Sequence, residues 1–380
     1  MKTRLGIGIW VLASWVHAGP LVAIGGGLTP ENEAVYRTII ELAGTDPTLC
    51  IFGTASSDPQ DSAEAYVADF ATYGATAEVV DITTENAATS TRDDAVVAAI
   101  RGCDGYFFTG GDQRRITEAL LDNGEDTPAL TALRERFAAG APVVGTSAGL
   151  AAMSDPMISG GVSVDTLLSG PDPVTLEPGL GFTDVLLDQH SVERGRFGRL
   201  LGALFDSNST LGVGVSEDTA VVIPETGPWR VIGAGYVVVL EVPVDSTLET
   251  PKGVEMSLIS SGDTFDPETS TFNILEGRSA DEVGTYYDPG TIFAVDIFGP
   301  EVVGDVLKRL IDSPEMQASG LGFLGSNEAS FSADGVRLVF EKTERTQGYW
   351  GRVDGEDYSV VRVGVRLEPV EVSVSPRGSN

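Results

Sequence analysis

Short apolar, β-rich runs alternate with amphipathic helical segments between residues 21 and 145 of the chain. The β-rich runs are residues 21–24, 49–52, 78–82, 105–109 and 142–145. The segments with apolar residues at helical spacing are residues 31–42, 61–73, 92–101 and 115–121. Strands that alternate with helices in this way are typical of a parallel sheet with helices on both faces. An α/β fold is therefore predicted for this part of the chain.

The second half of the chain has a different pattern. Strand-like segments predominate from residue 211 to about residue 261, and the composition changes again after residue 275. Residues 301–311 place their apolar side chains on one face of a predicted helix. Apolar and other residues alternate along 361–367, as expected for antiparallel strands. We predict a first domain over residues 19–275 and a mostly β C-terminal extension, with one helix and antiparallel strands, over residues 276–380.

The N-terminus has the organisation of a secretory signal peptide. Lys2 and Arg4 precede an apolar run over residues 5–15, and small residues stand where cleavage after Ala18 requires them. A membrane anchor is the alternative, but it needs about 17 or more apolar residues, and this run is shorter. We predict a signal peptide at residues 1–18 and export to the periplasm or the medium. No later run is long enough to span a bilayer, so no membrane association is expected after processing.

The 380 residues include 56 acidic and 24 basic side chains, a formal net charge of -32. Nucleic acid and anionic membrane surfaces are repelled by such a charge and are not expected as partners. The two cysteines, Cys50 and Cys103, lack the Cys/His spacing of a zinc site, and neither a metal nor a cofactor is expected. Two buried free thiols are the preferred interpretation of this pair, and a single disulfide is the alternative in an oxidising compartment.

Residues 145–149 form a Gly-Thr-Ser-Ala-Gly pentad, which has the GxSxG pattern of a nucleophile elbow. A buried-strand run precedes the pentad and a helical segment follows it, as such an elbow requires. In that setting the hydroxyl of Ser147 projects at the carboxyl edge of the sheet. A plain strand-to-helix loop with a capping serine is the alternative. The run Gly25-Gly26-Gly27 lacks the GxGxxG spacing of a dinucleotide loop and is interpreted as a tight strand exit near that edge.

His190 is the histidine that remains if the signal peptide is removed, because the other one is His17. If residues 191–201 form a helix, His190 and Arg194 lie one turn apart on one face. Guanidinium groups pair bidentately with carboxylates, so arginines beside this histidine are candidates for binding substrate carboxylates. A solvated helix surface is the alternative. The arginines concerned are Arg194, Arg196 and Arg199.

Glu217 follows His190 in the chain and lies among apolar strand residues. A carboxylate near a histidine can fix its tautomer and stabilise the imidazolium, so Glu217 is a candidate for that role. Asp184 and Asp188, just before the histidine, are alternatives. The order serine, histidine, acid differs from that of α/β-hydrolases, in which the acid precedes the histidine.

Taken together, several motifs resemble cyanophycinases. The matching segments follow the family order, and they are residues 53–57, 107–116, 145–149, 188–190, 194–200, 212–220 and 256–265. The resemblance implies a parallel-sheet sandwich like that of class I glutamine amidotransferases, and a homodimer. It also implies a serine exopeptidase that acts on cyanophycin, a polyaspartate backbone with arginine on each β-carboxyl, and releases β-aspartyl-arginine dipeptides.

The resemblance assigns site residues position by position. Ser147 matches the nucleophile, His190 the base and Glu217 the acid. The amide of Ala148, together with Gly110 and Gly111, matches the oxyanion hole. The substrate-pocket positions are Gln113, Asp188, Gln189, Arg194, Arg196 and Arg199. Two residues depart from the family pattern: Ser191 stands where an aromatic is usual, and Ser216 where an acid usually precedes the glutamate.

The chain is therefore interpreted as an exported cyanophycinase-like serine peptidase with a Ser-His-Glu triad. One alternative is an aspartyl dipeptidase-like peptidase that acts on small peptides. Another is a non-catalytic, exported binding protein of the same fold. The C-terminal extension has no counterpart in the compact intracellular enzymes of the family.

Overall fold

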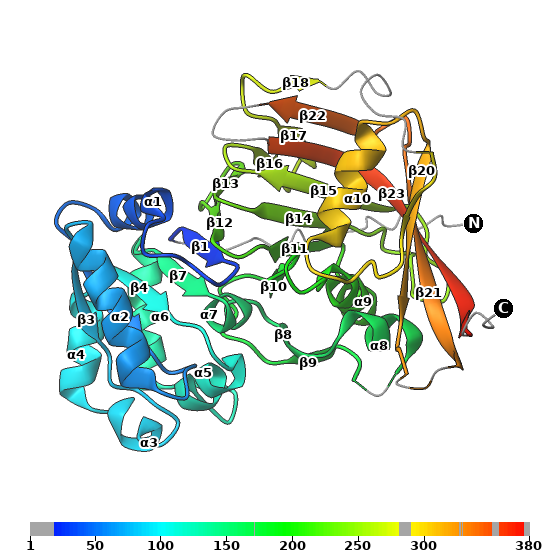
Figure 1. Cartoon of the computed structure of the whole chain (residues 1–380). Coiled ribbons are helices and arrows are strands. Elements are labelled where there is room, and N and C mark those ends of the chain that lie inside the picture. The colour runs from blue at the N-terminus through cyan, green and yellow to red at the C-terminus, as the bar shows by residue number, and fades with distance from the viewer. Residues whose placement is uncertain are drawn as a thin grey trace, which may run out of the picture.

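The computed structural model describes residues 19–170, 172–280, 290–326, 328, 330–351 and 357–375. The predicted signal peptide, residues 1–18, lies outside the described residues. Two large sheets organise the described chain (Figure 1). A nine-stranded sheet holds five strands between residues 21 and 146 and four between residues 219 and 273. A ten-stranded sheet holds four strands between residues 186 and 260 and six strands after residue 275.

The centre of the nine-stranded sheet is parallel. Its parallel strands, in spatial order, are β1 (Leu21–Ile24), β7 (Val143–Thr146), β4 (Gly105–Phe108), β2 (Thr48–Phe52) and β3 (Thr76–Val79). The predicted α/β sheet is confirmed, although β3 ends before Val80 and Ile82, which are buried in the loop that follows. Antiparallel strands continue the sheet beyond β1, and they are β12 (Thr219–Ile223), β13 (Trp229–Gly233), β16 (Thr264–Asp266) and β17 (Thr271–Asn273).

Helices cover both faces of this sheet. Successive residues of a strand point to opposite faces, so Val22 and Ile24 of β1 join one core and Leu21 and Ala23 join the other. The first core lies under α1 (Glu33–Ala43) and α2 (Pro59–Thr72). The helices on the other face are α3 (Ala87–Ser90), α4 (Asp94–Gly102), α5 (Gln113–Leu120) and α6 (Pro128–Ala138). Of these, α3 and α6 are not among the predicted helices.

The ten-stranded sheet contains strands from both sides of the predicted boundary near residue 275. The strands before it are β10 (Leu186–Gln189), β11 (Leu211–Val215), β14 (Tyr236–Glu241) and β15 (Val254–Ser260). Those after it are β18 (Ser279–Ala280), β19 (Ile292–Ala294), β20 (Gln317–Phe323), β21 (Phe331–Glu341), β22 (Gln347–Gly351) and β23 (Asp357–Val374). Since β15 pairs with β23, a division near residue 275 cuts through one continuous sheet.

Helix α10 (Val302–Ile311) confirms the amphipathic helix that the sequence predicts in the extension. The mostly β character of the extension is likewise confirmed. Shorter elements complete the described structure, and they are the strand pairs β5 (Leu121–Asp122) with β6 (Glu125–Asp126) and β8 (Met157–Gly160) with β9 (Thr175–Glu177), and the helix α8 (Ser163–Leu168).

Helix α9 (Phe197–Ser207) begins at Phe197, so the condition that residues 191–201 form a helix is met only from residue 197 onward. Residues 191–196, which we call the arginine loop, form turns instead. His190 has a φ of 51° and Gly195 a φ of 55°, and a right-handed helix cannot include such residues. The chain therefore reverses after the histidine before α9 starts.

A buried ion pair joins the extension to the rest of the chain. Nη1 of Arg278 lies 2.5 Å from Oδ1 of Asp263, and both side chains are fully buried. The same guanidinium nitrogen donates to the hydroxyl of Ser359 on β23 at 2.9 Å, and that hydroxyl donates to Asp263. Asp263 lies between β15 and β16, which belong to different sheets. The network thus links both sheets through the extension.

Cys50 and Cys103 form a disulfide, so the preferred interpretation of two free thiols is wrong. The sulfur atoms join β2 to the residue that ends α4, with the Cα atoms 5.8 Å apart. Both residues are buried in the core between the sheet and its helices. Within the described ranges, no helix combines the length and the apolar character needed to cross a membrane.

Candidate active site

Ser147 occupies a sharp turn between β7 and α7 (Ala148–Ala151). Its backbone has a φ of 52° and a ψ of -112°, a region that non-glycine residues rarely adopt. The turn needs glycine on both sides, because a Cβ on Gly145 would lie 2.3 Å from the backbone of Gly149, and one on Gly149 would lie 2.3 Å from the carbonyl oxygen of Phe108. The Ser147 side chain makes no capping hydrogen bond. The strand-turn-helix elbow is therefore present, and the capping-serine alternative is not.

The imidazole of His190 lies between Ser147 and Glu217. Its Nε2 is 2.8 Å from Oγ of Ser147, and its Nδ1 is 2.5 Å from Oε1 of Glu217. Ser147 follows β7 of the nine-stranded sheet, whereas His190 follows β10 and Glu217 follows β11 of the ten-stranded sheet. The structure thus brings the three predicted residues together where the two sheets adjoin.

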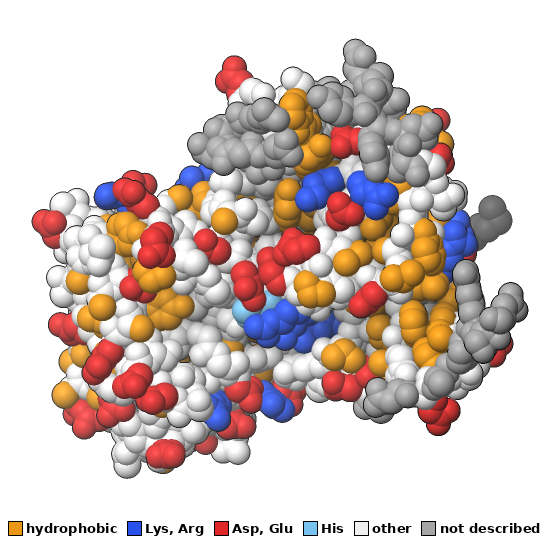
Figure 2. Space-filling model, in the orientation of Figure 1, with side chains coloured by type: hydrophobic (Ala, Val, Ile, Leu, Met, Phe, Trp, Pro, Cys, Tyr) orange, Lys and Arg blue, Asp and Glu red, His pale blue; other side chains and the backbone are white. Residues whose placement is uncertain are grey.

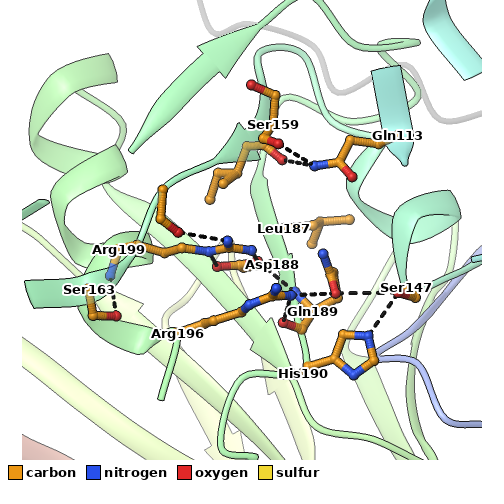
Figure 3. Close-up of polar contacts among 12 residues, drawn as sticks. Gln113, Ser147, Ser159, Ser163, Leu187, Asp188, Gln189, His190, Arg196 and Arg199 are labelled. Carbon is orange, nitrogen blue, oxygen red and sulfur yellow. Dashed lines mark hydrogen bonds and ion pairs between the residues drawn. The ribbon is translucent and has the colours of Figure 1, made fainter. Parts of the chain in front are cut away.

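Asp184 and Asp188 do not take the place of Glu217. Asp184 is exposed on the loop before β10. The carboxylate of Asp188 is fully buried and accepts two hydrogen bonds from Arg199, at 2.8 Å from Nε and 2.6 Å from Nη2 (Figure 3). Glu217 is the carboxylate that contacts the imidazole.

Burial lowers the pKa of His190 below its ordinary value, the hydrogen bond to Glu217 opposes this shift, and the positive charge of Arg194 adds to it. The imidazole is therefore neutral over a wider pH range than an exposed histidine. A neutral Nε2 can accept the proton of Ser147, and the bond from Nδ1–H to Glu217 selects the tautomer that leaves Nε2 free to do so.

The glycine run Gly25-Gly26-Gly27 forms the wall behind the imidazole. The carbonyl oxygen of Gly25 accepts a hydrogen bond from the N–H of His190 at 2.8 Å. A Cβ on Gly26 would lie 2.2 Å from the His190 ring, and one on Gly27 would lie 3.1 Å from Oε2 of Glu217. The sequence indicates a tight strand exit here but not its contact with these two side chains. The histidine and the glutamate exclude side chains at Gly26 and Gly27, and the carbonyl oxygen of Ser216, 2.0 Å from a Cβ on Gly25, excludes one there.

The backbone amides predicted to form an oxyanion hole are those of Gly110, Gly111 and Ala148. Gly110 lies so close that a Cβ on it would be 3.6 Å from Oγ of Ser147. Gly111 has a φ of 144°, and a Cβ there would lie 2.0 Å from the carbonyl oxygen of Ala55. Within the ranges that the structure describes, none of the three amides donates a hydrogen bond. They are therefore available to a negatively charged oxygen.

A pocket of about 290 Å³ opens beside Ser147. Its lining is mainly polar and basic, and it includes Asp112, Gln113, Arg114, Ser159, Gln189, Arg194, Arg196 and Arg199. On the molecular surface the histidine lies in a hollow, next to a patch of basic side chains and below a group of acidic ones (Figure 2). Basic side chains in such a pocket can pair with carboxylates of a ligand that lies close to Ser147.

Arg194 and Arg196 reach the pocket from the arginine loop. Arg196 donates from Nη1 to the side-chain oxygen of Gln189 at 2.6 Å, and burial lowers its pKa to about 10 (Figure 3). Arg194 is half exposed, and its Nη2 lies 3.8 Å from Oε1 of Glu217. Gln189 also lies near the nucleophile, with its Oε1 3.4 Å from Oγ of Ser147. Arg196 of the loop therefore contacts Gln189, which in turn lies beside Ser147.

Arg199 and Asp188 occupy the floor of the pocket as an ion pair. Their side chains are only 6% and 1% exposed, so the charge of this arginine is already balanced by a carboxylate of the same chain. Nη1 of Arg199 also donates to the carbonyl oxygen of Gly161 at 3.0 Å. Gln113 is tied by its amide to the carbonyl oxygens of Ile158 and Ser159. These residues give the pocket its shape.

The comparison with known sequence families decides which class of protein carries this site. Residues 21–228 match the family described as "Peptidase family S51". The chain belongs to peptidase family S51. The match includes all three residues of the hydrogen-bonded serine, histidine and glutamate set.

Curated relatives of this S51 peptidase are named cyanophycinase. One, from Nostoc sp., is 32% identical over 250 residues, which is 62% of this chain and 80% of the relative. Another, from Synechococcus elongatus, is 34% identical over 232 residues, which is 59% of this chain and 69% of the relative. A peptidase from an acI-B1 Actinobacterium shares the fold, with a TM-score of 0.51 and 18% identity over 66% of this chain and 97% of that one. The chain is thus a cyanophycinase-like peptidase.

Two serines flank the predicted catalytic residues of this S51 peptidase, and they are the two residues that the sequence analysis singles out. Ser191 follows His190, and Ser216 precedes Glu217. Both are buried, and neither hydroxyl has a hydrogen-bond partner among the residues that the structure describes. Nothing in the structure explains the choice of serine at these two positions.

Proposed function

We propose that this S51 peptidase is an exported serine exopeptidase that hydrolyses cyanophycin to β-aspartyl-arginine dipeptides. The observation that carries the proposal is the hydrogen-bond chain from Ser147 through His190 to Glu217 beside an arginine-lined pocket. The names of the curated relatives supply the substrate class. A non-catalytic binding protein has no use for a nucleophile elbow aligned with an imidazole.

In the first half of the reaction Ser147 attacks the scissile carbonyl carbon, and Nε2 of His190 takes the hydroxyl proton. Glu217 holds the imidazole and stabilises the imidazolium that forms. The negative oxygen of the tetrahedral intermediate accepts hydrogen bonds from the amides of Gly110, Gly111 and Ala148. The imidazolium then gives its proton to the leaving amine as the carbon–nitrogen bond breaks, which leaves an ester on Ser147.

In the second half a water molecule attacks the ester carbonyl, and His190 takes a proton from the water. The ester bond breaks, the Ser147 oxygen recovers a proton from the imidazolium, and a free carboxylate leaves. No group other than water is consumed, and the peptidase returns to its starting state.

The charges of the chain fit a polymer of this kind. Each β-carboxyl of cyanophycin is joined by an amide bond to an arginine, whose cationic guanidinium is balanced by its own α-carboxylate. The polymer is therefore nearly neutral, and its guanidinium groups suit an acidic surface. Free carboxylate at the end of the polymer needs local positive charge, which Arg194 and Arg196 supply in the pocket. A polymer end that enters the pocket is expected to orient by these two side chains.

Incubation of purified protein with cyanophycin, followed by mass analysis of the products, tests the proposal. The expected product is β-aspartyl-arginine, and Ser147→Ala is the matched inactive control. Faster cleavage of aspartyl dipeptides than of cyanophycin would replace the proposal with the aspartyl dipeptidase alternative. Binding of cyanophycin without any hydrolysis would replace it with the binding-protein alternative.

Export and dimerisation remain parts of the proposal. The disulfide between Cys50 and Cys103 supports an oxidising destination, because such bonds persist outside the reducing cytosol. N-terminal sequencing of protein recovered from the periplasm and the medium should give a chain that begins at Gly19. Sedimentation of the mature chain should give the mass of a homodimer.

A further inference from the structure

A segment of the C-terminal extension packs directly on the arginine loop. The N–H of Glu301 donates to the carbonyl oxygen of Val192 at 3.1 Å. Gly195 lies against the backbone of Phe298, so that a Cβ on the glycine would be 2.1 Å from the carbonyl oxygen of Phe298. Phe298 and Glu301 lie beyond residues 21–228, the part that matches the family. The substrate side of the site therefore touches residues from outside the family region.

The ring of Phe298 fills a slot between two glycines. A Cβ on Gly198 of α9 would lie 2.6 Å from one edge of the ring, and a Cβ on Gly322 of β20 would lie 2.3 Å from another. The ring also packs on Phe197, with the ring centroids 5.1 Å apart. The ring of Phe298 thus packs between β20 of the extension and the start of α9, where the arginine loop ends. We call this packing the wedge.

The anchors of His190 come from a different part of the chain. Its N–H donates to Gly25, and its imidazole bonds Ser147 and Glu217. The N–H of Ser191 donates to the carbonyl oxygen of Val215 on β11 at 3.0 Å. All of these partners lie inside the family region. The histidine is held by the family fold alone. The arginine loop is held on two sides, because Ser191 bonds Val215 and the hydroxyl of Ser163 donates to the carbonyl oxygen of Gly195 at 2.6 Å within the family region, while Phe298 and Glu301 contact the loop from the extension.

We propose that Phe298 and Glu301 are positioning residues for the arginine loop, so that the extension sets the affinity of the pocket for substrate carboxylates. The proposal rests on the proposed function in one respect, namely that Arg194 and Arg196 bind the substrate. Neither Phe298 nor Glu301 takes part in the chemistry of Ser147. Loss of the wedge lets the loop move while the nucleophile and its histidine stay in place.

The test compares Phe298→Ala with the wild-type protein in two assays. The first is steady-state hydrolysis of a short cyanophycin oligomer, which reports KM and kcat. The second is the rate of inactivation by phenylmethylsulfonyl fluoride, a small reagent that needs Ser147 and His190 but no arginine. We expect KM to rise about tenfold, as for a weakened charge-assisted contact, with kcat and the inactivation rate within about twofold of wild type.

Three further variants separate positioning from stability. Phe298→Leu keeps most of the apolar volume and should recover most of the wild-type KM. Gly322→Ala places a methyl group of β20 where the Phe298 ring lies, so the ring must move. This variant should raise KM although residue 298 itself is unchanged. Phe331→Ala is the matched control, because it removes a ring from the same extension whose aromatic partner is Phe323, at 6.3 Å. It should lower the melting temperature without changing KM.

An unchanged KM in folded Phe298→Ala and Gly322→Ala overturns the proposal. So does a parallel loss of kcat and inactivation rate, because the extension would then support the whole site. If the wild-type protein does not cleave the oligomer, the proposed function fails instead. The same KM comparison is then made with aspartyl p-nitroanilide, a substrate of the alternative peptidase. If the KM for this substrate is equal in Phe298→Ala and the wild-type protein, the positioning role is contradicted.

Discussion

The two sheets supply different halves of the site. The nine-stranded sheet presents Ser147 at the end of β7, one of several parallel strands of only four or five residues that helices cover on both faces. The ten-stranded sheet presents His190 and Glu217, and it is mostly antiparallel, with one strand of 18 residues. The proposed reaction therefore moves a proton from a serine that follows a strand of the nine-stranded sheet to a histidine that follows a strand of the ten-stranded sheet. Both sheets are drawn in Figure 1.

The two sheets position the residues of the site in different ways. A parallel strand that runs into a helix fixes the serine through its own tight turn, and the pentad that forms this turn is visible in the local sequence. The histidine and the glutamate depend on the pairing of β10 with β11 and on the glycine run after β1, which lies far away in the chain. Substitutions far away in the chain are therefore expected to disturb His190 and Glu217 more than Ser147.

The largest effects are expected at the residues that meet between the sheets. Ser147→Ala removes the nucleophile from the first half and should lower kcat/KM for cyanophycin by about 10⁴-fold or more, because the triad acts as a unit. The rate of dipeptide release measures this loss, and an unchanged circular dichroism spectrum verifies the fold. Activity near the wild-type level would assign the nucleophile elsewhere.

Glu217→Gln tests the second half of the site. It keeps the shape of the side chain but removes the charge that stabilises the imidazolium, and it should lower kcat by about 10²-fold or more. Asp188→Asn is the comparison, because its partner Arg199 lies away from the imidazole, and its main effect should be on folding. If Asp188→Asn abolished turnover in a folded protein and Glu217→Gln did not, the acid would be reassigned to Asp188.

Arg278→Met tests whether the extension is part of the framework. It leaves Asp263 buried without its ion-pair partner, and the free energy of unfolding should fall by about 3–5 kcal/mol. Urea denaturation measures the change. The control is Arg92→Gln, which breaks an exposed ion pair with Asp122 and should cost at most about 1 kcal/mol. Equal losses in the two variants would mean that the buried network does not hold the sheets together.

Arg196→Gln tests the basic pocket. Loss of one charge-assisted contact should raise KM for cyanophycin oligomers by about tenfold, with a smaller effect on kcat. Arg101→Gln, on the surface of α4, removes the same charge far from the pocket and serves as the control. If both variants changed KM equally, the effect would reflect net charge rather than a specific contact.

The pH profile should show the smallest effect. Because burial lowers the pKa of His190, its neutral form persists below the ordinary histidine value of about 6.5. Activity should fall as the pH drops through this lowered pKa, so the acid limb of the kcat/KM profile should have its midpoint below about 6.5. A midpoint above that value would show that Glu217 outweighs burial.

The sequence predicts the first half of the molecule better than the second. The parallel strands and the elbow are visible because their patterns are local, over a few residues each. The late start of α9 is not, because Gly195 and His190 adopt left-handed conformations only in the context of their packing. The pairing of β15 with β23 joins segments about a hundred residues apart, and the spacing of apolar residues within each segment does not predict such a pairing.

The residues of the candidate site differ in the same way in how well the sequence predicts them. The serine, histidine and glutamate follow from motifs, and the structure brings them together. The pairing of Arg199 with Asp188 and the disulfide depend on distances between strands and helices that spacing in the sequence does not give. The contact of Phe298 with the arginine loop likewise appears only in three dimensions.

Labelling with a fluorophosphonate tests the central claim most directly, because it requires a nucleophile from one sheet to be activated by a histidine from the other. We predict a single adduct, mapped by mass spectrometry to Ser147, and a rate of labelling at least about 10³-fold lower in His190→Ala. Ser147→Ala should take no label. An adduct on another serine, or an unchanged rate in His190→Ala, would contradict the account.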